Sequence, residues 1–170
     1  MDQGIIGQFA AIGVLPPLLV VAAANDIARL KIPNWVSALL ALSFFPAAAL
    51  AGFSWDAIGQ HAAVGAGGLV LGFLFFVRNW IGAGDAKLFA AIALWMGWPG
   101  AGQFAVVAAL IGGVLAVSLL LARKAAAYAP PWPWLEDIER RTKHIPYAVA
   151  LSGGALIAYP NTDLFLMLTR

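Results

Sequence analysis

Long apolar stretches alternate with short polar segments along the whole chain. A hydrocarbon core of ~30 Å requires about 20 residues of α-helix, and most of the stretches approach or reach that length. They cover approximately residues 5–24, 35–52, 61–77, 86–98, 103–122 and 145–168. The sequence therefore predicts an all-α fold, a polytopic bundle of about six transmembrane helices that forms a single membrane-embedded domain over residues 1–170.

Several of these stretches contain an irregularity. Pro16 and Pro17 are expected to kink the first one. The fourth is too short to cross a bilayer unaided, so we expect either the turn around Pro99 or the segment 82–85 to lie below the membrane surface. Gly100 to Gly102 are expected to turn the chain after it. The last stretch is interrupted at Pro160 and Asn161.

Composition supports a membrane protein and excludes several kinds of chemistry. Hydrophobic residues make up 62% of the chain and charged residues 11%, whereas a soluble domain is roughly half apolar and a quarter charged. The absence of cysteine excludes disulfides, a thiol nucleophile and Cys-ligated zinc. A net charge of +2 is too small to indicate a nucleic-acid partner, so none is expected.

The distribution of basic residues predicts the orientation of the bundle. Every lysine and arginine except Arg170 lies in or beside the three connections on one side of the predicted bundle. Basic connections stay in the cytoplasm, so we expect a multi-pass protein of the cytoplasmic (inner) membrane with both termini extracytoplasmic. The tryptophans, Trp95 included, fall near predicted span ends and are expected to be interfacial anchors.

Two aspartates are predicted on the cytoplasmic side at the ends of apolar stretches. Asp26 follows the first stretch, and Asp85 follows two glycines in Gly82-Ala83-Gly84-Asp85. An ionisable residue within a membrane segment indicates a functional site, and the glycines suggest a backbone break that presents Asp85 to water inside the bundle. Two structural interpretations remain open: Asp85 as the N-cap of the fourth span, and Asp26 as an ion-pair partner of Arg29.

A pair of carboxyl groups that shares a proton can hydrolyse a peptide bond without a metal or a cofactor. The ionised carboxylate takes a proton from water, and the protonated carboxyl donates to the carbonyl oxygen. Because a helix start favours a carboxylate and a helix end disfavours it, we expect Asp85 to be the ionised member and Asp26 to hold the proton.

Three short blocks carry a resemblance to a known family. Asp26-Ile-Ala-Arg29-Leu-Lys31-Ile-Pro33-Asn34 resembles the first conserved block of the type IV prepilin peptidases. Gly82-Ala-Gly84-Asp85-Ala-Lys87-Leu, followed by Trp95-Met-Gly97, resembles the GxGD block, and Ile145-Pro146-Tyr147-Ala resembles the third. The order and the predicted topology agree with that family over roughly residues 20–155.

The resemblance implies an aspartyl protease that removes the short basic leader from prepilins or pseudopilins at the cytoplasmic face of the membrane. It implies that Asp26 and Asp85 are catalytic and that Gly82 and Gly84 form the break that places Asp85. Other positions that match the motifs are Arg29, Lys31, Pro33, Asn34 and Lys87. Beyond its substrate, with a basic leader and an apolar helix, the expected partner is membrane lipid.

The sequence departs from the larger members of that family. They carry an N-terminal extension with Cys-x-x-Cys pairs and also N-methylate the new N-terminus, whereas this chain has no cysteine. It resembles the short peptidases of tight-adherence (Flp) pilus systems, and cleavage without methylation is expected. The alternatives are an archaeal preflagellin peptidase, an ion- or proton-translocating protein that uses the same carboxylates, and a non-catalytic subunit of a secretion apparatus.

Overall fold

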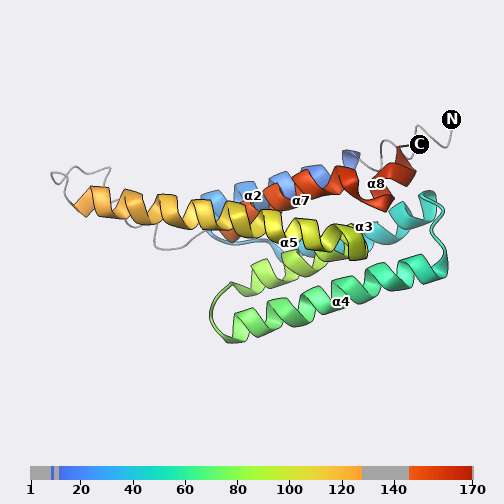
Figure 1. Ribbon diagram of the computed structural model, residues 1–170, viewed down its shortest axis with the longest axis horizontal. Coiled ribbons are helices and arrows are strands. Elements are labelled where there is room, and N and C mark those ends of the chain that lie inside the picture. The colour runs from blue at the N-terminus through green and yellow to red at the C-terminus, as the bar shows by residue number, and fades with distance from the viewer. Residues whose placement is uncertain (1–8, 10–11, 128–145, 170) are drawn as a thin grey trace.

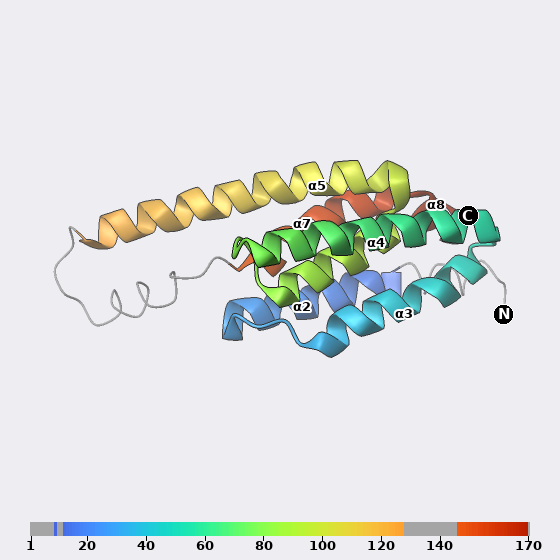
Figure 2. The ribbon, with the colours of Figure 1, turned by 90° about the horizontal axis from the view of Figure 1, so that it is seen from below.

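The computed structural model describes residues 9, 12–127 and 146–169, and all regular elements in this part of the chain are helices. Figures 1 and 2 show an elongated bundle whose helices run along its long axis. The elements are α2 (Leu15–Arg29), α3 (Asn34–Leu50), α4 (Trp55–Val77), α5 (Ala83–Ala127), α7 (Tyr147–Ala158), η1 (Tyr159–Asn161) and α8 (Asp163–Leu168). The all-α prediction is therefore confirmed for the described residues.

Two of the helices are long and apolar enough to cross a bilayer. They are α4 and the stretch 83–125 of α5. Helix α4 begins earlier than the predicted third span because the Ser54 side chain caps it, accepting a hydrogen bond from the Ala57 N–H at 3.2 Å. Residues 55–60, expected to be a connection, are therefore the first turns of the helix.

The prolines of the first predicted span lie at a helix start. Pro16 and Pro17 occupy the first turn of α2. N–H groups in the first turn have no carbonyl acceptor within the helix, so proline costs no hydrogen bond there. Helix α2 ends at Arg29 with Leu30 in the left-handed conformation (φ 52°), and the Leu30 N–H donates to the Asp26 carbonyl at 2.8 Å. The extended Pro33 then leads directly into α3.

Helix α5 consists of two antiparallel segments that reverse at Gly97. Gly97 has φ 62° and ψ −174°, and a Cβ there would lie 2.5 Å from the His61 ring. Only glycine combines this conformation with so close a contact. The turn expected at Gly100 to Gly102 is therefore earlier, and Pro99 lies at the start of the second segment (residues 98–127). Figure 2 shows that segment running back along the first (residues 83–96).

Glycines let α4 and the first segment of α5 pack closely. A Cβ at Gly65, Gly68 or Gly72 would lie 3.0 Å from atoms of α5, so these positions form the contact face. On the other side, the second segment of α5 packs on α7, where a Cβ at Gly154 would lie 2.7 Å from the Ala108 backbone. Small residues allow membrane helices to approach in this way.

One of the tryptophans is a core residue. Trp95 is fully buried, and its Nε1 donates to the Leu40 carbonyl at 2.7 Å, so the expectation that it anchors the protein at a membrane interface is wrong. Trp55 and Trp98, in contrast, are 87% and 80% exposed. The interruption predicted at Pro160 and Asn161 is confirmed, because η1 separates α7 from α8 there.

Candidate functional site

Both aspartates lie at one end of the bundle, where α2 and α4 end and where α3, α5 and α7 begin (Figures 1 and 2). Asp26, in the last turn of α2, is 6% exposed. Asp85, in the first turn of α5, is half-buried. Residues far apart in the sequence therefore lie at the same end of the bundle.

The Asp85 carboxylate is held by the start of its own helix. Its Oδ2 accepts a hydrogen bond from the Gly82 N–H at 3.1 Å. This contact is one half of a capping box, in which an acidic residue in the first turn reaches back to the N-cap backbone. A Cβ at Gly82 would lie 2.9 Å from that oxygen. Asp85 is thus not the N-cap residue itself, and Gly82 makes room for its carboxylate.

The Asp26 carboxylate is held by a different helix. Its Oδ2 accepts a buried hydrogen bond from the Ala148 N–H at 2.8 Å. Ala148 is in the first turn of α7, whose N-cap, Pro146, offers no side-chain cap. Asp26 therefore serves as a cap for α7, and the Arg29 side chain, its suggested ion-pair partner, is exposed. A second bond, from Ser152 Oγ to the Leu19 carbonyl at 3.0 Å, also joins α7 to α2.

Each carboxylate consequently lies at the N-terminal end of a helix, which favours negative charge. The expectation that Asp26 holds the proton was based only on its place at the end of α2. Because α7 donates an N–H to Asp26, that argument no longer separates the two residues. The structure therefore corrects the argument from helix ends, because that argument applies equally to both carboxyls.

The first block of the sequence packs against the second. A Cβ at Gly84 would lie 3.3 Å from the Ile32 Cβ, so Gly84, which is inside the first turn of α5, provides a close contact rather than a break. Lys87 Nζ donates to Asn34 Oδ1 at 3.0 Å. Two contacts thus join the start of α5 to the start of α3, and Lys87 bonds an amide rather than Asp85.

The remaining motif positions lie around this contact. Arg29 and Lys31 have exposed side chains, and Pro33 is half-buried between α2 and α3. None of them has a side-chain hydrogen bond with another of the described residues. Their contribution is to the short connection that turns the chain between the two helices.

A cavity of about 550 Å³ opens beside Asp85. Its walls come from α4, from both segments of α5 and from α7, and they are apolar apart from Asp85 and the hydroxyl of Tyr147. Small residues of the second α5 segment, such as Ala109 and Gly113, form much of one wall.

One residue of the site and one of the helices that position it had no role assigned from sequence. Gly97 was quoted within a motif, but periodicity alone does not distinguish it from the nearby Gly100 and Gly102 as the turning point. No side chain in the sequence indicates that the backbone N–H of Ala148 would bind Asp26, although the nearby Pro146 marks a helix start. Within residues 12–127 and 146–169, no group of three His, Asp or Glu side chains is arranged to hold a metal ion.

The comparisons with known proteins gave a family match. Residues 13–117 match the model of the type IV leader peptidase family, a range that is more than half of the chain and includes both Asp26 and Asp85. Comparison with curated proteins and with solved structures gave no match.

Proposed function

The chain belongs to the type IV leader peptidase family, and on this basis we propose that it is a membrane aspartic endopeptidase. Asp26 and Asp85 are its catalytic pair, and it removes the short basic leader from prepilins or pseudopilins without N-methylation. The observation that supports the proposal is the placement of the two carboxyls at the same end of the bundle, where each accepts a hydrogen bond from the N–H of a helix start.

The arrangement supports a direct attack by water. The ionised carboxylate takes a proton from the water while the oxygen bonds to the peptide carbonyl carbon, and the protonated carboxyl gives its proton to the carbonyl oxygen. When the tetrahedral intermediate collapses, the C–N bond breaks, the leaving amine takes the proton that the first carboxyl gained from water, and the second carboxylate recovers a proton from one hydroxyl of the intermediate. The two N–H contacts keep one oxygen of each carboxyl fixed, which leaves the other for this exchange.

The site lies toward the cytoplasm in this proposal. Arg29, Lys31, Arg78 and Lys87 are all near the end of the bundle that holds the aspartates, and basic residues favour the cytoplasmic side. The enzyme is then a multi-pass protein of the cytoplasmic membrane with both termini outside. Arg140, Arg141 and Lys143, which contributed to the same prediction, lie outside the described residues.

The decisive experiment is co-expression with a candidate prepilin. Asp26→Asn and Asp85→Asn should each abolish leader removal, while Asp56→Asn, an exposed residue at the start of α4, should leave it unchanged. Immunoblots of membrane fractions report the shift in substrate size. Leader removal that survives either substitution in the pair would exclude this mechanism.

An archaeal preflagellin is the second candidate substrate, because the GxGD block is shared with those peptidases. The same co-expression assay with a preflagellin distinguishes the two substrates. Ion or proton translocation by the two carboxylates is the alternative of another class. Purified protein in vesicles that moves protons but cleaves neither substrate would favour it.

A further inference from the structure

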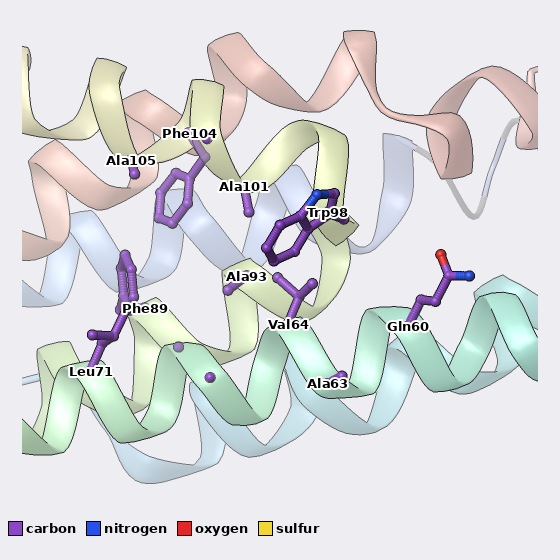
Figure 3. Close-up of a pocket in the computed structure, with 13 residues that line it drawn as sticks. Gln60, Ala63, Val64, Leu71, Phe89, Ala93, Trp98, Ala101, Phe104 and Ala105 are labelled. Carbon is purple, nitrogen blue, oxygen red and sulfur yellow. The ribbon is translucent and has the colours of Figure 1, made fainter.

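A second cavity continues the one beside Asp85 along the bundle. It has a volume of about 790 Å³ and lies between α4 and the second segment of α5, above the first segment. Leu71, Phe89 and Ala105 line both cavities, so together they form one groove. Figure 3 shows Phe89 and Ala93 between the two helices that form its walls.

The groove extends over much of the membrane thickness. On α4 its lining runs from Gln60 to Phe75, which corresponds to roughly 22 Å of helix at 1.5 Å per residue. Asp85 lies at one end, and Gln60 and Trp98 lie at the other (Figure 3). The groove therefore leads from the aspartates toward the opposite face of the bundle.

The chemistry of the walls restricts what can occupy the groove. Between its polar ends the lining is apolar, and many residues are small, including Ala63 and Gly67 on α4 and Gly102 and Ala105 on α5. Small side chains allow the backbone of another helix to approach closely. In lipid, a peptide must satisfy its backbone hydrogen bonds internally, which requires a helix.

We propose that this groove is the docking site for the apolar helix of the substrate, with the scissile bond at Asp85 and the helix extending toward Trp98. The inference rests on the proposed function, since it assigns a place to the segment that follows the leader. The continuity of the groove with Asp85 favours this occupant. If the substrate is cut at Asp85, the residues that follow its cleavage site lie where the groove continues. Lipid chains or a second copy of this protein would be competing occupants.

The first test fills the groove without disturbing the fold. A Cβ at Gly67 or at Gly102 meets nothing within 4 Å, so Gly67→Leu and Gly102→Leu place bulk in the open groove from opposite walls. Both should lower kcat/KM at least tenfold for a substrate that carries its apolar helix. A short peptide that contains only the leader and the cleavage site should be cut at a rate within twofold of wild type.

Gly59→Leu is the matched control. Gly59 is also on α4 with open space around its Cβ, but it lies outside the groove, so cleavage of both substrates should stay within twofold. Unchanged cleavage of the full substrate by the groove variants would overturn the proposal. An equal loss with the short peptide would also overturn it, because the bulk would then be acting on the catalytic pair.

The second test detects binding of the substrate in a variant that does not cleave it. A photoreactive amino acid in place of Val64 or of Ala105, in an Asp85→Asn background, should crosslink to the apolar helix of a co-expressed prepilin, and the same group at Gly59 should not. Crosslinks only to lipid or to a second copy of the enzyme would overturn the proposal. Crosslinks to a prepilin that the enzyme with Asp85 intact does not cleave would retain the groove and exclude the proposed peptidase.

Discussion

At the residue scale, the site depends on backbone groups as much as on side chains. Asp85 accepts the Gly82 N–H and Asp26 accepts the Ala148 N–H. Hydrogen bonds to a charged group contribute about 1.5–3 kcal/mol, enough to fix the orientation of each carboxyl group. The second of these contacts joins residues that are 122 positions apart, so it also ties α2 to α7.

Removing the Ala148 N–H should therefore impair the enzyme specifically. Ala148→Pro eliminates the donor in the first turn of α7, where proline is tolerated, and should lower kcat/KM by roughly 10- to 100-fold, as expected for a lost hydrogen bond to a carboxylate. Kinetics on a purified prepilin measure the loss. Thermal unfolding in detergent should show a folded protein with a lower Tm, because the buried contact that ties α2 to α7 is lost.

Val149→Pro is the control for that prediction, because the Val149 N–H is in the same turn but donates to the Pro146 carbonyl at 3.2 Å. Its kcat/KM should remain within about threefold of wild type. If both proline variants lost activity to the same extent, the loss would come from the helix start in general and the Asp26 contact would have no specific role.

At the scale of elements, glycine positions decide how closely helices pack. Gly72 faces α5, and a Cβ there would lie 3.0 Å from the Ala86 Cα and 3.1 Å from its carbonyl oxygen. Gly59 on the same helix has nothing within 4 Å. Alanine can therefore be introduced on the same helix both at a tightly packed position, Gly72, and at a position with free space, Gly59.

Gly72→Ala should destabilise the protein by about 1–3 kcal/mol, the usual cost of overpacking, because the neighbouring atoms belong to backbone and have little room to move. Gly59→Ala should instead stabilise it by up to ~1 kcal/mol through helix propensity. Unfolding in detergent followed by circular dichroism gives both values. A Gly72→Ala protein as stable as the Gly59→Ala protein would contradict the close packing of α4 on α5.

At the scale of the whole molecule, the proposed orientation places the two ends of the bundle in different compartments. The chain has no cysteine, so single cysteines can report on each end. Asn79→Cys, after α4 and near the aspartates, should react with a membrane-impermeant thiol reagent only in inside-out vesicles. Asn161→Cys, in η1 at the opposite end, should react in intact cells with a permeabilised outer layer.

A cysteine pair that reacted from the same side would rule out that topology. Leu69→Cys on α4 provides the control for reagent access, since an exposed residue in the middle of an apolar stretch should react from neither side. Mass shifts on gels after labelling are sufficient to score all three positions.

Much of this architecture follows from local pattern, and the rest does not. The length of the apolar stretches predicts the helices. The connections next to Asp26 and Asp85 fall on the same side of the predicted bundle, which predicts that the two aspartates lie at one end. The role of each glycine was not predictable, since glycine serves equally in a turn, as at Gly97, and in a close contact, as at Gly84. The partner of Asp26 depends on how α2 packs on α7, which no short-range pattern encodes.

The reversal at Gly97 has a geometric consequence for catalysis. Asp85 lies about 18 Å along the helix from Gly97 at 1.5 Å per residue. A small change of angle at Gly97 would therefore displace Asp85 by a larger distance. A rotation of about 5° at Gly97 would carry Asp85 through roughly 1.6 Å, and displacements near 1 Å can cost about 100-fold in rate. At the Asp85 end, the close approach of Gly84 to Ile32 and the hydrogen bond from Lys87 to Asn34 hold the same segment, so the position of Asp85 depends on contacts at both ends of the segment.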